Sequence, residues 1–478
     1  MNTEALSRVQ FALTASFHFI FPPISMGLGL MLVVMGLVYL RTKDPKWRQL
    51  SVFWVKIYGI VFAMGVATGV VQEFEFGMNW ADYSRFVGNV FGSLLAAEGV
   101  FAFALEGGFL GLMLFGGSRL GPKLWLFSIF MVVFGAHFSA LWILMANSWM
   151  QTPAGYTIAQ TPAPARAVMT DFWSVVFTPS FIPRLLHVFV ASWTVGAGLM
   201  LSVSAWFMLR KRHLDLARAN LALALPFFVL FAISNVFIFG ADMAIEVTNN
   251  QPLKLASMEG LWQSTSCAPM FLLGWVDTAT QTTTGINIPC LLSFLAYQDI
   301  HATVAGIDSF SPAPLPPINL VFQVYHLMIN LGVVLAGSGV LAGLWFVWKR
   351  RIYRSRFVLG LLVLSVFLGE MAITAGWWTA EIGRQPWIVY NVLLTANGVS
   401  PILGADQVLA SLGLFIGMYA LLFVLFLYLM NRRIQAGPEP LDETLELSSL
   451  PDTFRDVFRK RPLDAGPAST HHDAGLKP

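Results

Sequence analysis

Four side chains that can ligate iron lie inside or beside long apolar stretches of the sequence: His18, His187, Met328 and Glu381. An ionisable group in hydrocarbon costs several kcal/mol unless a partner or a cavity receives it, so each is a functional candidate. His and Met are the common axial ligands of low-spin haem iron, whereas a lone His or carboxylate leaves a coordination position open to oxygen. Taken singly, each is better explained by an interhelical hydrogen bond or by core packing. Their occurrence at one expected depth favours a cofactor site.

Two further carboxylates, Glu98 and Glu106, share one apolar stretch and lie eight residues apart. On a helix this spacing corresponds to about 12 Å along the axis and to similar faces. Two carboxylates at increasing depth are expected of a proton relay, with Glu98 nearer the cofactors and Glu106 nearer the membrane centre. The alternative is two unrelated interhelical hydrogen bonds. His137 and Ser139 are weaker candidates for the same route, because a hydrogen-bonded structural His explains the first equally well.

The composition determines the solvent in which these residues work. Of 478 residues, 56% are hydrophobic and 12% are charged, and the mean hydropathy is +0.67. Soluble domains carry about 25% charged residues, so the sequence indicates an integral membrane protein. The net charge of +3 predicts no nucleic-acid partner, because the basic residues form short clusters between apolar stretches. The first apolar stretch lacks a following small-residue cleavage site, so it is not expected to be a removable signal peptide.

The sequence predicts an all-α fold, because about 20 apolar residues suffice for a helix to cross a membrane and nine stretches are that long. Basic residues gather in alternate connections, which places the N-terminus outside and the C-terminus in the cytoplasm. We expect a membrane region over residues 1–435 and a flexible cytoplasmic tail over 436–478. The nine expected spans are 12–40, 51–76, 93–116, 124–146, 184–209, 219–243, 321–348, 356–378 and 404–430.

Two connections on the outer side, about 147–183 and 244–320, are too long to be simple turns, and long loops inside a compact fold are usually functional. The second contains both cysteines, Cys267 and Cys290. A disulfide is permitted on the oxidising side of a membrane, but the sequence leaves the pairing open.

Over about residues 1–435 the chain resembles subunit I of the cytochrome bd quinol oxidases. The resemblance is carried by LSRVQFALTASFHFIFPP around His18, GVATGVVQEFEFGMNW, SALWILMANSWMQTP and GWWTAEIGRQPW around Glu381. The GRQPW segment is the most diagnostic. The resemblance implies that His187 and Met328 ligate a low-spin haem b. It further implies that His18 and Glu381 ligate a high-spin haem b and haem d, or a third b-type haem, with the assignment between them open.

The resemblance also implies roles outside the iron ligands. Lys254 and Glu259, within QPLKLASMEGLWQ, would be quinol-binding residues of the loop 244–320, with Asp242 a weaker contributor. The implied partners are subunit II in a heterodimer, small single-helix accessory subunits, ubiquinol or menaquinol, oxygen and membrane lipid. Three residues would support the haems, since an Arg suits propionate binding; they are Arg384, Trp377 and Arg8.

Two departures from the family stand out. Well-known members carry an Arg two residues before the Met ligand, where this chain has His326, so this His could compete as a ligand. The quinol loop also lacks the long second half found in some members, and is similar to the shorter-loop branch that includes the cyanide-insensitive oxidases.

The expected function is therefore quinol oxidation outside a bacterial cytoplasmic membrane, with electrons passing to oxygen and protons taken up from the cytoplasm. Such a reaction separates charge without a pump. Two alternatives remain at this point. A proton-coupled transporter would use its intramembrane carboxylates and broken helices, such as at Phe21-Pro22-Pro23, to line a substrate path. A di-haem b subunit of another respiratory complex would show His pairs along the same helices.

Overall fold

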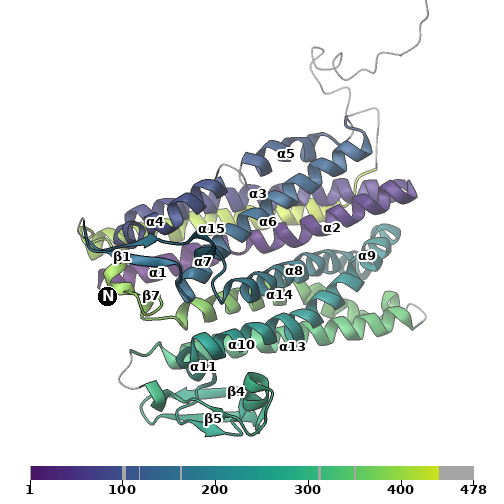
Figure 1. Cartoon of the computed structure of the whole chain (residues 1–478). Helices are drawn as coiled ribbons and strands as arrows, with labels where there is room; N and C mark the ends of the chain where they lie inside the picture. The colour runs from purple at the N-terminus through teal and green to yellow at the C-terminus, as the bar shows by residue number, and fades with distance from the viewer. Residues whose placement is uncertain are drawn as a thin grey trace, which may run out of the picture.

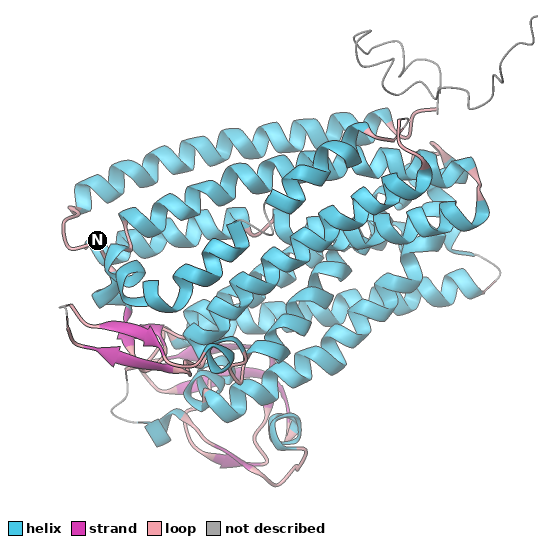
Figure 2. Cartoon of the chain, turned by 45° about the horizontal axis from the view of Figure 1, so that its top comes forward, coloured by secondary structure: helices cyan, strands magenta, loops and turns pink. Residues whose placement is uncertain are grey.

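The computed structural model describes residues 2–99, 104–117, 119–161, 164–310, 314–348 and 351–440. Long helices run roughly parallel in one elongated bundle, and the N-terminus and the strands lie at the same end of it (Figures 1 and 2). We call this the loop end, and the opposite end the far end. The long helical segments are α1 (Thr3–His18), α2 (Phe21–Thr42), α3 (Pro45–Met78), α4 (Ala81–Ala97), α5 (Ala104–Phe115), α6 (Pro122–Gln151), α8 (Phe181–Leu209), α9 (Leu214–Ser234), η2 (Asn235–Phe239), α10 (Gly240–Asn250), α13 (Ile318–Val347), α14 (Arg356–Ile382) and α15 (Ala405–Ala436).

Eight helical segments among the described residues are long and apolar enough to cross a membrane, and each contains one of the expected spans or nearly all of it. The all-α membrane fold is thereby confirmed. The remaining expected span, 93–116, falls on the end of α4 and on α5, and residues 100–103 between them lie outside the described residues. Most of the expected tail, residues 441–478, lies outside them as well.

Local sequence explains where several helices begin. Asp44 precedes Pro45 and accepts a hydrogen bond from the Lys46 backbone N–H at 3.0 Å, which starts α3. Ser355 caps α14 in the same way, through the Val358 N–H at 3.4 Å. Capping side chains satisfy backbone donors that a helix start leaves free, and Pro at the first position has no such donor to lose.

The helices pack closely where small residues face one another. Gly27 of α2 and Gly196 of α8 meet backbone to backbone, and a Cβ on Gly27 would lie 2.1 Å from the Ser192 carbonyl oxygen. Any larger residue would force the two helices apart. Helices α8, α9, α13 and α14 form a second group of neighbours, in which α14 packs against both α8 and α13. The predicted ligands His187, Met328 and Glu381 lie on these helices.

The connections at the loop end contain all the strands and most short helices. Four two-stranded antiparallel sheets pair β1 with β2, β3 with β6, β4 with β5 and β7 with β8. A disulfide joins Cys267 to Cys290 within the long loop, which settles the pairing that the sequence left open. The strands are β1 (Tyr156–Ala159), β2 (Arg166–Met169), β3 (Thr265–Ser266), β4 (Met270–Asp277), β5 (Thr282–Ile288), β6 (Thr303–Val304), β7 (Trp387–Val389) and β8 (Leu393–Leu394). The short helices are α7 (Phe172–Val176), α11 (Pro252–Glu259), α12 (Leu291–Tyr297), η3 (Ile307–Phe310), η4 (Arg351–Arg354) and η5 (Thr395–Gly398).

Candidate functional site

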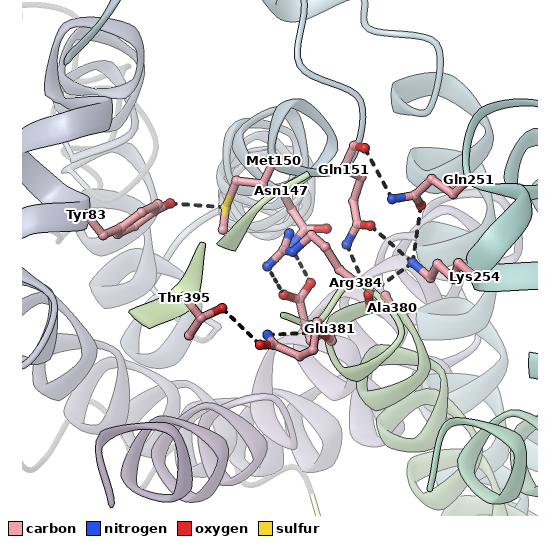
Figure 3. A network of polar contacts seen from close by, with 11 residues as sticks. Tyr83, Asn147, Met150, Gln151, Gln251, Lys254, Ala380, Glu381, Arg384 and Thr395 are labelled. Carbon is pink, nitrogen blue, oxygen red and sulfur yellow. Dashed lines mark hydrogen bonds and ion pairs between the residues drawn. The ribbon is translucent and has the colours of Figure 1, made fainter. Parts of the chain in front are cut away.

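A buried polar network joins the long loop to the end of α14 (Figure 3). Lys254 of α11 donates from Nζ to the Ala380 carbonyl oxygen at 3.0 Å and to Gln151 Oε1 at 3.1 Å. It also reaches Gln251 Oε1 at 3.3 Å, and Gln251 in turn donates to the Gln151 carbonyl oxygen. Lys254 is 2% exposed, so these three acceptors replace its hydration.

The surroundings of Lys254 change its protonation. Burial and the nearby Arg184 guanidinium together lower the pKa of Lys254 to about 7, against the opposing attraction of Glu381. At neutral pH this amine is therefore divided between its charged and neutral forms. Such a group can both donate a hydrogen bond and accept a proton, as an acid–base group near substrate must.

Glu381 is held in place by two donors from different parts of the chain. Asn147 of α6 donates to its Oε1 at 2.8 Å, and Arg384 pairs with its Oε2 (Figure 3). Arg384 is almost fully buried, yet its Nε and Nη1 have no hydrogen-bond partner among the described residues. Free N–H groups of a buried guanidinium suit an anionic acceptor such as a carboxylate.

A second set of unpartnered charges lies beside this network. Arg184 of α8 and Glu246 of α10 are both buried and both interact electrostatically with Lys254. Within the described part of the chain, Nε and Nη2 of Arg184 and both carboxylate oxygens of Glu246 have no hydrogen-bond partner. Arg184 stands one turn before His187 on the same helix. Buried charges are costly unless paired, so these groups favour a ligand that supplies the missing partners.

A cleft of about 300 Å³ opens beside Lys254 at the loop end. A volume near this lies at the small end of the range for ligand pockets. Arg384 and Lys254 supply its charged groups, Gln385 and Asn391 add polar amides, and most of the remaining lining is aromatic or proline. The other lining residues are Leu253, Phe310, Pro314, Pro316, Gly383, Gln385, Trp387, Tyr390 and Asn391.

Glu259 lies on the same short helix as Lys254 but points elsewhere. Its Oε2 is 3.8 Å from Nε2 of His326, and the side chain is 1% exposed. Burial raises the pKa of Glu259 to about 8, although the Tyr325 hydroxyl acts in the opposite direction. The structure therefore brings Lys254 to Glu381 and Glu259 to α13, and it does not bring the two loop residues together.

His326 and Met328 face different sides of α13, because residues two positions apart on a helix are separated by about 200° around its axis. The His326 ring is buried, and its Nδ1 lies 2.8 Å from the Phe322 carbonyl oxygen. With Glu259 at its other nitrogen, His326 is engaged on the side of the loop. Met328 instead lies against α14, where a Cβ on Gly376 would be 2.8 Å from its sulfur.

One ring nitrogen of His187 has no protein partner among the described residues. This nitrogen is Nδ1, and it is buried. The π-helical segment η2 precedes Gly240, and a Cβ on this glycine would come within 3.6 Å of the His187 ring. Irregular π turns often occur at functional sites, and here the turn places the smallest residue against the ring.

The predicted ligand His18 and the supporting residues Trp377 and Arg8 are more scattered. His18 ends α1, and its Nδ1 lies 2.9 Å from the Thr68 hydroxyl of α3. Trp377 packs against Phe19, with 6.0 Å between ring centroids. Arg8 is partly exposed and pairs with Glu4 at 3.6 Å, so the structure does not bring it to the network of Figure 3.

The two relay candidates have one hydroxyl partner each. Ser139 of α6 donates to Glu98 at 2.6 Å, and the Tyr58 hydroxyl of α3 approaches Glu106 at 3.5 Å. Glu98 follows the last residue of α4, and Glu106 lies in the first turn of α5. His137 does not join them, because the Trp193 indole donates to its Nε2 at 2.9 Å and its Nδ1 lies 2.8 Å from the Val133 carbonyl oxygen.

Several buried ionisable groups escaped the sequence analysis. They are Arg184, Glu246, Glu75 and Glu370. Both carboxylate oxygens of Glu370, within α14, have no hydrogen-bond partner in the described part of the chain, and Glu75 receives a 2.5 Å hydrogen bond from Thr14. For Arg184, Glu75 and Glu370 the signal was present, because each is an ionisable residue in an expected span, the same criterion that selected Glu98 and Glu106. Glu246 falls in the connection 244–320, where ionisable residues are expected.

The chain is similar to known proteins over nearly its whole length. Residues 6–438 match the family model described as cytochrome bd terminal oxidase subunit I. The chain is 36% identical over 450 residues to cytochrome bd ubiquinol oxidase subunit 1 of Bacillus subtilis (strain 168), covering 92% of this chain and 95% of that protein. It is 33% identical over 503 residues to cytochrome bd-II ubiquinol oxidase subunit 1 of Escherichia coli (strain K12), covering 91% and 97%. The solved bd oxidase from Geobacillus thermodenitrificans has a TM-score of 0.85 and 28% identity, covering 91% of this chain and 99% of that one.

Proposed function

Since this chain belongs to the family of cytochrome bd terminal oxidase subunit I, an integral membrane haem protein with quinol:oxygen oxidoreductase activity, we propose that it oxidises quinol in the cleft beside Lys254. The family membership decides against the transporter and against a di-haem subunit of another complex. It also implies a second subunit as partner and a quinol as substrate. The observation that carries the placement of the substrate site is the position of Lys254, between a ligand-sized cleft and the carboxylate Glu381.

The chain's own residues fit haem groups. His187 and Met328 would hold the iron of a low-spin haem b, and His18 and Glu381 would ligate a high-spin haem b and haem d or a third b-type haem. Arg184 and Arg384 carry buried N–H groups without protein acceptors, which suit the propionates of such groups. When bound, the haems supply one-electron transfer and the reduction of oxygen to water.

Substrate binding follows from the lining of the cleft. Phe310, Trp387 and Tyr390 provide aromatic surface for a quinol ring, and Lys254 can donate a hydrogen bond to a quinol oxygen. Because the pKa of Lys254 is lowered to about 7, its neutral form can take a proton from the quinol hydroxyl. The proton then leaves at the loop end. Glu259 lies on the other side of α11, where it faces His326 of α13.

We place the loop end outside a bacterial cytoplasmic membrane and the far end in the cytoplasm, as the basic connections predict. Protons for oxygen reduction would rise from the far end past Glu106 and then Glu98, with Tyr58 and Ser139 as their hydroxyl partners. Quinol oxidation and proton uptake on opposite sides would build a proton motive force. The heterodimer with subunit II, small accessory subunits and ubiquinol or menaquinol complete the proposal.

The test uses the purified complex with both subunits. Lys254→Met should reduce quinol-dependent oxygen consumption at least tenfold while leaving the reduced-minus-oxidised haem spectrum unchanged. Lys46→Met is the matched control, because Lys46 is a half-exposed lysine at the far end that pairs with Asp44. Normal quinol oxidation by the Lys254 variant would move the substrate site elsewhere. The absence of haem from the purified complex would contradict the proposed oxidase function.

A further inference from the structure

The hairpin β4–β5 carries an apolar face that the described residues leave uncovered. In the pairing of the two strands, Leu273 stands opposite Ile286 and Trp275 opposite Thr284, so these side chains share one face. Leu273, Trp275 and Ile286 are 61%, 62% and 64% exposed. The opposite face packs inward, where Gly274 meets Phe322 of α13. Such an exposed apolar patch marks a site of interaction.

The whole segment around the hairpin is nearly free of charge. Residues 260–298 contain a single charged residue, Asp277, and it lies next to the turn between the two strands. Soluble globular domains carry about 25% charged residues on average. Most residues of the turn itself are polar, with Thr280 and Gln281 exposed. The hairpin is therefore polar at its turn and apolar toward its open end.

Three side-chain contacts fix how the hairpin lies along α13. Asn319 accepts from the Val276 N–H at 3.2 Å, and Gln323 donates to the Gly274 carbonyl at 2.9 Å. Asn330 donates to the Leu272 carbonyl at 2.9 Å. Asn319 and Asn330 are about 16 Å apart along the helix. The hairpin therefore runs that far along α13, from the loop end toward the far end (Figure 1).

The hairpin lies on the outward side of α13. At about 100° per residue, Asn319, Gln323 and Asn330 fall within about 40° of one another, and Met328 faces the opposite side. From Asn330 toward the far end, the same outward face continues with Val334, Leu344 and Trp348, all exposed and none charged. Helix α13 is one of the segments able to cross a membrane. The outward face of α13 is thus polar where the hairpin covers it and apolar between Asn330 and the far end.

The length of this apolar part of α13 indicates how far toward the loop end the bilayer extends. From Asn330 to the helix end at Val347 the rise is about 26 Å, which is less than the hydrocarbon thickness of about 30 Å. The bilayer must therefore extend past Asn330 to the open end of the hairpin, where Leu273 and Ile286 lie. Trp275 stands slightly nearer the turn, at the height where Trp is enriched at membrane–water interfaces.

We propose that the apolar face of the β4–β5 hairpin is seated in lipid, at the boundary between acyl chains and headgroups on the loop side of the membrane. The hairpin is also tied to the substrate loop, because Thr283 of β5 donates to the Gly260 carbonyl at 2.6 Å, directly after Glu259. Anchoring in lipid consequently fixes the height of α11, and with it Lys254 and Glu259, relative to the membrane surface. A lipid-soluble substrate would meet the loop at that height.

Site-directed spin labelling of the two-subunit complex in nanodiscs of phosphatidylethanolamine and phosphatidylglycerol tests this proposal. Both native cysteines of this chain are held in the disulfide, so within this chain a label attaches only to an introduced cysteine, and the complex without that cysteine gives the background from the second subunit. Ile286→Cys and Leu273→Cys place labels on the apolar face, one on each strand. Thr280→Cys places the matched control label at the turn. The haem spectrum of each labelled complex verifies that the protein has folded.

Power saturation then distinguishes the environments. Labels at 273 and 286 should be relaxed several-fold more by oxygen, which concentrates in the bilayer, than by a water-soluble nickel chelate, and the label at 280 should show the reverse order. Strong relaxation by nickel at 273 and 286 would place the hairpin in water and overturn the proposal. Shielding from both agents would show that a protein subunit covers the face, which overturns it equally.

Discussion

Replacing Glu259 by Gln should remove a pH dependence from the stability of helix α11. The pKa of Glu259 is raised by burial from its ordinary value of 4.5 to about 8. A carboxyl group with a raised pKa in the folded state contributes its full stability below about pH 4.5 and loses it as the pH rises toward 8. From about pH 5.5 to about pH 8.5 the loss amounts to about 3 kcal/mol, or a factor of about 100 in the opening equilibrium.

Hydrogen exchange of the α11 amides measures this opening directly. At each pH the wild-type complex is compared with Glu259→Gln, so that the intrinsic pH dependence of exchange cancels. The ratio of protection, wild type over variant, should fall about 100-fold across this range. Asp215→Asn is the control, because this carboxylate is 100% exposed in its side chain. His326 also faces Glu259, so the fall should persist in a His326→Gln background. A ratio that stays constant with pH would refute the raised pKa of Glu259.

Two further predictions concern the cofactors and the proton route. His187→Ala and Met328→Ala should each abolish the low-spin haem signal and quinol oxidation, because low-spin iron needs both axial ligands, and optical spectra that keep the signal in both variants would contradict the assignment. Glu106→Gln keeps size and hydrogen bonding but removes the titratable proton, so steady-state haem reduction should rise as oxygen consumption falls. Glu98→Gln should show the same block by stopped-flow spectroscopy, and normal turnover in both Gln variants would leave these carboxylates as structural groups.

The sequence allowed the membrane helices to be predicted because hydrophobic length is a local property. Eight expected spans coincide with helical segments of the structure. The ninth expected span, 93–116, covers the end of α4 and α5, with residues 100–103 outside the described residues. Hydropathy reports that a segment avoids water, so it predicts which segments are membrane helices but not which helices lie side by side.

The geometry of the loop depends on contacts far apart in sequence and could not be predicted in this way. Lys254 and Glu259 are five residues apart, and their opposite orientations follow from α11 being a helix wedged between α13 and α14. The disulfide likewise required the separation of Cys267 and Cys290 in space. His326 was recognised as a departure from the family, but its role beside Glu259 appeared only with the packing of the loop.

The same helix α11 connects the proposed substrate cleft to two of the helices that carry predicted iron ligands. Lys254 binds the carbonyl of Ala380, the residue before Glu381, and Glu259 faces α13 two residues before Met328. A displacement of α11 would therefore alter the cleft and both contacts together. Because three hydrogen bonds hold Lys254 and each acceptor is itself buried or part-buried, removing the amine leaves Gln151, Gln251 and a backbone carbonyl without their donor. The proposed substrate cleft and the end of α14 therefore share one side chain, and its three acceptors offset the cost of burying the amine.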